Sequence, residues 1–257
     1  MRGLSGKRII IGGAARGMGA ALAQRLAQEG ASLVLGDVDE ASVRATAARI
    51  AGDGAHVTGV GFDLSDPASV AALVQTALDT LGGIDGLAIP AADLSAKGYR
   101  SDHHILDGLN IALWENTFRI NLIGHAQLME QAIPHMAAAG GGAIVSISSD
   151  AASAGHADKP AYSASKAGLQ ALVRHVARLC GKDNIRCNGV APGLVLTETA
   201  MEVIGDGWLD DRLALNALPR HGTAEDIANA MAFLLSDESS WITGQILSVN
   251  GGSLFRD

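Results

Sequence analysis

Two local patterns alternate along almost the whole chain, and this alternation limits the possible fold more than any other feature. Short runs of almost continuous hydrophobic residues are typical of parallel strands that are covered on both faces. Segments with the 3.6-residue periodicity of amphipathic helices separate these runs. The apolar runs are residues 8–13, 31–37, 56–62, 85–90, 142–148, 185–190 and 245–249. The helical segments are residues 18–30, 39–52, 66–82, 114–136, 162–180 and 224–238. We therefore predict an α/β fold, a doubly wound parallel sheet of about seven strands with helices on both faces.

Residues at the ends of the helical segments support this division. Asp66 and Thr223 are residue types that cap helix N-termini, because their side-chain oxygens accept backbone N–H bonds. Gly30, Gly52 and Gly82 stand where helices should end, and glycine is common there. We find no linker or internal repeat, so a single domain is predicted over residues 1–257.

Charge and composition argue against several classes of function. The formal net charge is −8 and the chain has no Lys/Arg cluster, which disfavours nucleic acid or an anionic membrane as a partner. The apolar run at the basic N-terminus is too short for a signal peptide, and no stretch is long enough to span a bilayer. Cys180 and Cys187 lack metal-type spacing, so no metal is predicted. A cytoplasmic protein is expected.

A glycine-rich segment, GGAARGMGAALAQ, directly follows the first apolar run. Gly13, Gly17 and Gly19 open a helix there, which is the context in which backbone approaches a pyrophosphate at a helix N-terminus. A purely structural turn is the alternative interpretation. Asp37, at the end of the second apolar run, favours a dinucleotide site because a carboxylate there can bond both hydroxyls of the adenine ribose.

Asp37 also bears on the choice of cofactor. A carboxylate repels the 2′-phosphate of NADP, so NAD is favoured. Arg16 favours the opposite choice, since a guanidinium could hold that phosphate, although it could equally be a solvated loop residue. Direct hydrogen bonding by Asp37 is expected to prevail, and NAD is the predicted cofactor.

The stretch AYSASKAG places Tyr162 and Lys166 four residues apart, on one face of a predicted helix. An ordinary surface pair is the alternative to a catalytic one. Lys166 and the positive charge of oxidised nicotinamide would both lower the pKa of Tyr162, so the phenol could exchange a proton with an alcohol. Ser149 ends a predicted strand and could hold the substrate oxygen beside Tyr162. Ser146 and Ser148 compete for that role, but strand alternation points Ser148 to the opposite face.

These motifs occur in the order typical of the short-chain dehydrogenase/reductase family, which the chain resembles over almost its entire length. The resemblance rests on the glycine loop and on the segments FDLSD, FRINLIGHAQL, IVSISS, YSASK and APGLVLTET. It implies a Rossmann-type fold. As catalytic residues it implies Asn121, Ser149, Tyr162 and Lys166. As cofactor-binding residues we expect Gly13, Arg16, Gly17, Met18, Gly19, Asp37, Asp63, Leu64, Ala91, Tyr162, Lys166, Pro192, Gly193, Val195 and Thr197.

The resemblance also implies features that single residues do not reveal. In the family, the residue matching Asn121 bends a long helix and holds a water behind the lysine. Members often pair through that helix and the one carrying the tyrosine, so a homo-oligomer, a dimer or tetramer, is expected.

Two departures from the family pattern concern the adenine side of the site. Gly12 stands where the family usually has Thr. The family's Asn-Asn-Ala-Gly reads IPAA at residues 89–92, where Pro90 also lacks a backbone donor. Neither departure touches the reacting end.

The segment at residues 93–113 is about seven residues longer than the family's usual connection. It contains SDHH at residues 101–104. Adjacent histidines point apart, so we predict a solvated loop or a subunit contact there rather than a metal site.

Substrate specificity is expected from a loop at about residues 194–222, which in the family folds over the site. This loop has apolar residues and no basic cluster, which favours an apolar or cyclic alcohol or ketone over a phosphorylated sugar. The apolar residues considered are Met201, Val203, Ile204, Trp208 and Leu209. We predict an NAD-dependent secondary-alcohol dehydrogenase or ketone reductase. The alternatives are an NADPH-dependent 3-oxoacyl-type reductase and a non-catalytic dinucleotide-binding sensor or scaffold.

Overall fold

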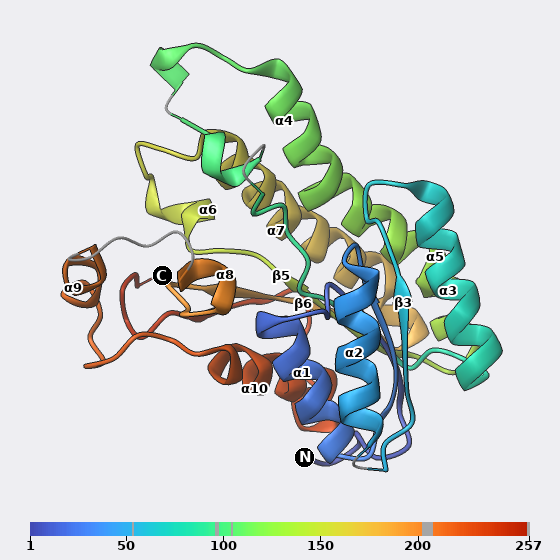
Figure 1. Cartoon of the computed structure of the whole chain (residues 1–257). Coiled ribbons are helices and arrows are strands. Elements are labelled where there is room, and N and C mark those ends of the chain that lie inside the picture. The colour runs from blue at the N-terminus through green and yellow to red at the C-terminus, as the bar shows by residue number, and fades with distance from the viewer. Residues whose placement is uncertain (53, 96–97, 104, 202–207, 256–257) are drawn as a thin grey trace.

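Seven parallel strands form one sheet at the centre of the molecule (Figure 1). The computed structural model describes residues 1–52, 54–95, 98–103, 105–201 and 208–255. The strands are β1 Arg8–Gly12, β2 Ser32–Asp37, β3 Val57–Gly61, β4 Gly86–Ile89, β5 Gly142–Ile147, β6 Ile185–Pro192 and β7 Ile246–Val249. Their order is β3-β2-β1-β4-β5-β6-β7, so the winding reverses between β1 and β4. The predicted doubly wound α/β sheet is confirmed.

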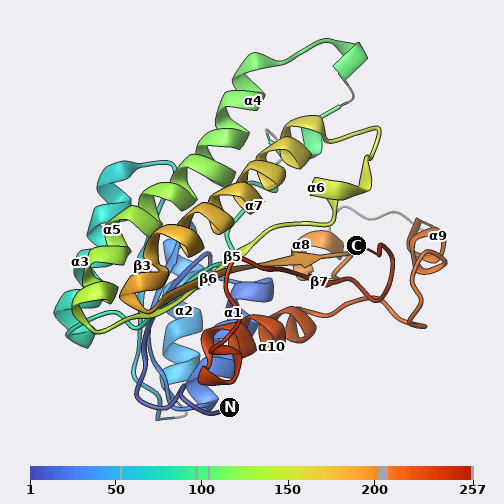
Figure 2. The same ribbon diagram turned by 180° about the vertical axis from the view of Figure 1, so that it is seen from behind.

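Helices cover both faces of this sheet (Figures 1 and 2). The α-helices are α1 Gly17–Gln28, α2 Glu40–Ala51, α3 Pro67–Leu81, α4 Ile111–Phe118, α5 His125–Ala138, α6 Ala151–Ala154, α7 Pro160–Cys180, α8 Glu198–Met201, α9 Trp208–Leu213 and α10 Ala224–Leu235. Helices α1, α2 and α10 pack on one face, and α3, α5 and α7 on the other. None of the helices in the described part of the chain has the length and hydrophobicity to cross a membrane.

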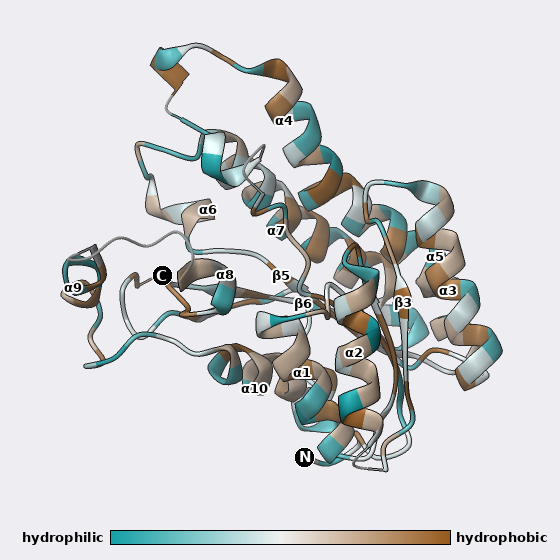
Figure 3. Ribbon diagram, in the orientation of Figure 1, coloured by the Kyte–Doolittle hydropathy of each residue, from teal (hydrophilic) through white to brown (hydrophobic). Residues whose placement is uncertain are grey.

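The β1 strand shows why continuous apolar runs form this sheet. Ile9 and Ile11 face the cluster that contains Leu22 of α1, whereas Ile10 faces the cluster that contains Val173 of α7. All three isoleucines are at most 1% exposed, and full burial of such a side chain contributes roughly 1.5–3 kcal/mol. Figure 3 shows hydrophilic and hydrophobic residues mixed around α1, α2 and α3, as expected of helices that cover a sheet on one side and meet solvent on the other.

The predicted helix ends are confirmed. The Asp66 side chain accepts from the N–H of Ala68. Thr223 and Asp226 form a reciprocal capping box at the start of α10. Gly82 follows α3 with a φ of 74°, a left-handed conformation that glycine adopts without a Cβ penalty.

The predicted helix over residues 114–136 is not one regular helix. A π-helical turn, Arg119–Gly124, separates α4 from α5. Asn121 lies in this turn and is fully buried. Gly124 also lies there, and a Cβ on it would stand 2.3 Å from the carbonyl oxygen of Leu64. Hydrophobic periodicity does not distinguish a π turn from an α turn, and such turns are frequent at functional sites.

We expect Thr223→Ala to lower the free energy of unfolding by about 1 kcal/mol, because it removes the acceptor for the N–H of Asp226. Urea unfolding followed by circular dichroism measures this. Thr80→Ala is the matched control, since Thr80 is exposed inside α3 and alanine has the higher helix propensity. A Thr223→Ala variant as stable as the control would contradict the capping role.

Candidate active site

A cleft of about 2210 Å³ opens at the carboxyl ends of the strands. It exceeds the roughly 300–1,000 Å³ typical of a pocket for one drug-sized ligand, so it can hold a dinucleotide together with a substrate. It lies where the winding of the sheet reverses, the usual ligand site of doubly wound sheets. All the predicted site residues except Asn121 and Lys166 line this cleft, and those two are fully buried.

The glycine loop between β1 and α1 leaves no space for side chains at two positions. Gly13 has a φ of 100°, and a Cβ on it would stand 2.7 Å from backbone atoms of Ala91. A Cβ on Gly19 would stand 1.8 Å from the carbonyl oxygen of Gly13. Helix α1 begins here without a side-chain cap, so its first N–H groups face the cleft end of the loop. This cradle fits the pyrophosphate of a dinucleotide.

Asp37 connects the glycine loop to the end of β2. One carboxylate oxygen accepts from the N–H of Ala15 at 2.9 Å, and the other from the N–H of Asp39 at 3.1 Å. Hydrogen bonds from Ser42, and to a smaller extent the charge of Arg16, lower the pKa of Asp39. The guanidinium of Arg16 is therefore close to a second carboxylate at this end of the cleft.

The two departures from the family pattern have a packing explanation. A Cβ at Gly12 would stand 3.1 Å from the ring of Phe62, so Phe62 fills the space of a larger residue. His125 of α5 holds the IPAA segment, because its Nε2 lies 3.2 Å from the Ala91 carbonyl oxygen. Burial first, and then the charge of Lys166, lowers the pKa of His125 to about 3. The ring is neutral, so Nε2–H donates to Ala91.

Tyr162 and Lys166 lie one turn apart on α7, as predicted. The Lys166 ammonium nitrogen is 5.7 Å from the centroid of the Tyr162 ring. It donates to the carbonyl oxygen of Ile147, the last residue of β5, at 2.9 Å. Ser149 follows β5 directly and hydrogen-bonds to the Tyr162 phenol. The structure thus brings Ser149, Tyr162 and Lys166 together at one end of the cleft.

The pKa values of this pair differ from the prediction. Burial raises the pKa of Tyr162 to about 12, and the hydrogen bond with Ser149 only partly opposes this increase. Burial also lowers the pKa of Lys166 to about 7. The expected net lowering of the Tyr162 pKa is therefore not found for the protein's own groups. The desolvation of both side chains outweighs their attraction, because burial disfavours the charged form of each.

The three candidate serines have different partners. Ser146 is fully buried, and its hydroxyl lies 3.4 Å from Nδ1 of His125. Ser148 donates to the Lys166 carbonyl and accepts from the Gln170 amide. Of the three, only Ser149 hydrogen-bonds to the phenol, as predicted from the spacing.

Asn121 lies beneath the cleft and bonds to protein groups at both ends of its amide. Its Oδ1 accepts from the N–H of Asp93 at 2.8 Å, and its Nδ2 donates to the hydroxyl of Ser165 at 3.2 Å. It therefore connects the chain after β4 to helix α7.

The SDHH segment is a correction to the sequence prediction. Asp102 is only 2% exposed, and its carboxylate accepts from the N–H of Tyr162 at 2.9 Å. His103 is exposed, and His104 lies outside the described residues. Tyr99, just upstream, packs edge-on against the Tyr162 ring. Sequence reasoning missed both contacts, although the unusual length of the connection was a signal.

The predicted substrate loop contributes Leu194, Ala200, Arg212 and Leu215 to the cleft wall, while Val203 and Ile204 lie outside the described residues. Cations also line the cleft. Besides Arg16 of the glycine loop, they are Arg100, Lys159 and Arg212, which come from three separate segments. The carboxylates of Asp93, Asp150 and Asp158 line the same cleft. The absence of a basic cluster in the sequence therefore does not mean a cleft wall without cations.

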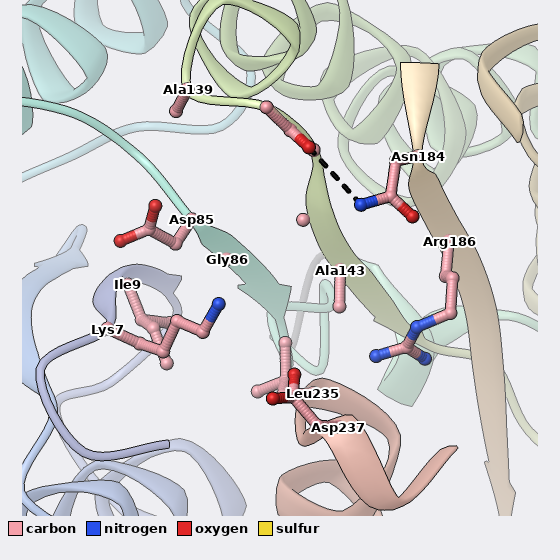
Figure 4. Close-up of a pocket in the computed structure, with 13 residues that line it drawn as sticks. Lys7, Ile9, Asp85, Gly86, Ala139, Ala143, Asn184, Arg186, Leu235 and Asp237 are labelled. Atoms are coloured by element: carbon pink, nitrogen blue, oxygen red, sulfur yellow. Dashed lines mark hydrogen bonds between the residues drawn. The ribbon is translucent and has the colours of Figure 1, made fainter. Parts of the chain in front are cut away.

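A second pocket, of about 140 Å³, lies among the N-terminal ends of β1, β4, β5 and β6, at the opposite edge of the sheet (Figure 4). Two of its charged groups, Asp85 and Arg186, already have partners. Asp85 accepts from the Arg8 guanidinium at 2.7 Å, and Arg186 donates to the carbonyls of Leu234 and Ser236. Within the described residues, no group of three or more His, Cys, Asp or Glu side chains could hold a metal ion.

The sheet order, the glycine loop and the cleft define a doubly wound α/β protein of the dinucleotide-binding class. A family model described as "Enoyl-(Acyl carrier protein) reductase" matches residues 13–253. The chain belongs to the short-chain dehydrogenase/reductase family, a family of oxidoreductases, as the sequence motifs indicate.

Relatives in this family are similar over nearly their full length. The chain is 39% identical to cis-4-hydroxycyclohexanecarboxylate dehydrogenase of Sinomonas cyclohexanicum, covering 95% of this chain and 94% of that protein. It is 34% identical to 7alpha-hydroxysteroid dehydrogenase of Bacteroides fragilis, over 98% of this chain and 96% of that protein. The fold also matches a solved structure of a 7 alpha-hydroxysteroid dehydrogenase complexed with NADH and 7-oxo glycochenodeoxycholic acid. The TM-score is 0.91 at 33% identity, and the match covers 97% of this chain and 95% of that chain. These relatives support an oxidoreductase of alcohols and ketones.

We expect Gly19→Ala to weaken binding of NADH about tenfold or more, a loss of at least ~1.4 kcal/mol, because the added methyl would displace the Gly13 carbonyl. Titration of NADH fluorescence measures the dissociation constant. Gly181→Ala is the matched control, since Gly181 has helical dihedrals and no atom within 4 Å of an added Cβ. Equal affinities in the two variants would contradict the assignment of the loop as the dinucleotide cradle.

Proposed function

We propose that the protein is an NAD-dependent dehydrogenase of secondary alcohols, working also as a reductase of the corresponding ketones, on apolar or cyclic skeletons. One observation carries this proposal. The phenol of Tyr162 hydrogen-bonds to Ser149, and the Lys166 ammonium nitrogen lies 5.7 Å from the centroid of its ring, in a cleft that the glycine loop also lines. A group that can exchange a proton is thus next to a group that can hold an oxygen atom.

The chain's own residues supply binding, orientation and proton transfer. The glycine loop and Asp37 would hold a nicotinamide dinucleotide in this cleft, which would supply the hydride acceptor for alcohol oxidation and the hydride donor for ketone reduction. In oxidation, the Tyr162 phenolate oxygen takes the hydroxyl proton of the alcohol as its C–H bond breaks. In reduction, the neutral phenol returns this proton to the new alkoxide. The Ser149 hydroxyl holds the reacting oxygen and donates to the charge that develops on it.

Lys166 has two tasks in this proposal. Its bond to the Ile147 carbonyl holds α7 against the end of β5, which fixes the distance between Tyr162 and Ser149. Its ammonium, when protonated, favours the phenolate form of Tyr162. Because burial sets the pKa of Lys166 to about 7, the ammonium form dominates only below neutral pH. The phenol is therefore mostly neutral, the form required for ketone reduction.

Asp37 supports NAD rather than NADP. Its carboxylate lines the cleft at the end of β2, and Asp39 follows it closely. Two carboxylates at this position would repel a 2′-phosphate, and the charge of Arg16 already acts on one of them. The complex of a relative with NADH agrees with this preference.

Two kinds of observation support a cyclic substrate. The relatives named above act on a substituted cyclohexanol and on a hydroxysteroid, by their names. Arg100, Lys159 and Arg212 at the cleft wall are compatible with a substrate that carries a carboxylate.

The function is tested by oxidation of cyclic, steroidal, terpenoid and aryl secondary alcohols with NAD and with NADP, followed by absorbance of the reduced cofactor. We expect turnover of at least one cyclic alcohol with NAD. Tyr162→Phe should lower kcat by about 10²–10⁴, because the proton-transfer group is removed.

Three outcomes would contradict this proposal. A strong preference for NADPH with 3-oxoacyl substrates would support the alternative reductase. Tight NAD binding without turnover of any alcohol would support a non-catalytic sensor. Unchanged turnover in Tyr162→Phe would assign the chemistry to another group.

The pH dependence follows from the pKa of Tyr162, which burial raises to about 12. Between pH 6 and 9 the phenol is neutral, and its phenolate fraction increases with pH. We therefore expect kcat/KM for alcohol oxidation to rise with pH. The slope should become smaller above pH 7, where Lys166 loses the ammonium charge that favours the phenolate. Ketone reduction uses the neutral phenol and should not rise over the same range. Initial rates in both directions measure this, and a reduction rate that increases with pH would exclude Tyr162 as the proton donor.

A further inference from the structure

Besides the bond of Ala91 to His125, two contacts among the described residues attach the connection between β4 and α4 to helices. The first attachment is Asp93, whose N–H donates to Asn121 at 2.8 Å and whose carboxylate accepts from the Asn116 amide at 2.9 Å. A Cβ at Gly98 would stand 1.9 Å from the Asp93 carboxylate, so the chain returns closely over this side chain. The start of the connection is therefore held in one position.

The second attachment is Asp102, at the N-terminus of α7. This helix begins at Pro160, and its first N–H groups have no acceptor within the helix. Lys159, at the N-cap position, provides no side-chain bond to them. Asp102 provides the acceptor from a distant part of the sequence, because its carboxylate oxygen lies 2.9 Å from the N–H of Tyr162. A carboxylate at this end also suits the helix dipole.

Lys159 completes the junction between the connection and α7. It has a φ of 61°, which is a strained conformation for a residue with a side chain. Its backbone N–H and its ammonium donate to the carbonyl oxygen of Asp102, at 3.2 and 3.3 Å. The ammonium also lies 5.2 Å from the centroid of the Tyr99 ring. These contacts with the connection therefore hold Lys159 in its strained backbone conformation.

The two attachments hold Tyr99 against Tyr162. Their ring centroids are 4.8 Å apart at an interplanar angle of 77°, an edge-to-face arrangement. Both residues line the cleft, so the Tyr99 ring forms the wall beside the phenol. A substrate ring bound at the Tyr162 oxygen would therefore have the Tyr99 ring as a neighbour.

We propose that Asp102 is a positioning residue for Tyr162, acting as a hydrogen-bond acceptor for its backbone N–H, and that Tyr99 is a specificity-determining residue for the substrate ring. The inference rests on the proposed function. Tyr162 lies in the first turn of α7. Loss of the Asp102 bond frees this turn, so the phenol can shift relative to Ser149. A shift of about 1 Å at a reacting group can cost 10²-fold in rate.

The kinetic test compares Asp102→Ala with Asp102→Asn. The alanine variant loses the acceptor, so we expect kcat to fall about tenfold or more while KM for NAD changes less than about twofold. The asparagine variant keeps an acceptor oxygen and should recover most of the activity. Asp107→Ala is the matched control, an exposed carboxylate of the same connection that does not line the cleft, and it should behave as the unchanged protein. Equal losses in both Asp102 variants, or no loss in the alanine variant, would overturn the positioning role.

A spectroscopic test does not depend on turnover. The chain has two tyrosines, so 3-fluorotyrosine labelling gives two fluorine NMR signals, which Tyr99→Phe assigns. Asp102→Ala should shift or broaden the Tyr162 signal, whereas Asp107→Ala should not. An unchanged Tyr162 signal in Asp102→Ala would overturn the proposal. If no alcohol is oxidised by the unchanged protein, the proposed function fails, and the fluorine spectra still decide the positioning role.

The specificity of Tyr99 is tested by two substitutions. Tyr99→Ala removes the wall and should raise kcat/KM for bulky polycyclic alcohols relative to cyclohexanol about tenfold. Tyr99→Phe keeps the ring and should leave this ratio within about twofold. An unchanged ratio in Tyr99→Ala would overturn the specificity role.

Discussion

The position of one buried ammonium determines the geometry of the site. Lys166 has no exposed surface, and an amine in such surroundings is costly unless it has a hydrogen-bond partner. Its partner is the carbonyl of Ile147 at the end of β5. This bond fixes the register of α7 against the sheet, and Tyr162 is one helical turn away. Ser149 lies two residues after Ile147 on the strand side, so this bond, together with those of Ser148 to α7, holds Tyr162 near Ser149.

Much of the fold could be predicted from the sequence because its signals are local. The Ile-rich β1 strand, buried on both faces, shows the continuous hydrophobicity of a covered parallel strand. Asp66 and Thr223 cap helices through bonds to residues two or three positions further on. The resemblance implied a bend at Asn121, but the sequence pattern could not show that the bend is a π-helical turn, because hydrophobic periodicity does not distinguish a π turn from an α turn.

The residues of the site also divide into those that local motifs predict and those that only the fold brings into contact. Tyr162, Lys166 and Ser149 belong to motifs in which spacing along the chain already implies proximity. Asp102 and His125 act on residues far away in sequence, and no spacing rule links them to their partners. The pKa values of Tyr162 and Lys166 were also hard to predict, because they depend on burial. The attraction between a phenol and an ammonium can be read from their spacing, but the desolvation that outweighs it depends on every element packed around them.

The π-helical turn at Arg119–Gly124 has a consequence for how the length of this chain can vary. An i→i+5 bonding pattern takes up one more residue than an α-helical turn. Leu113 of α4 and Leu128 of α5 are nevertheless both buried, so each helix keeps its own inward face across the turn. Deletion of one residue could therefore restore a regular helix with Asn121 turned away from Asp93. Such a deletion would lose that amide and would also disturb the turn's own contacts, because Ile120 packs against the core and Leu122 lies close to Gly168 of α7.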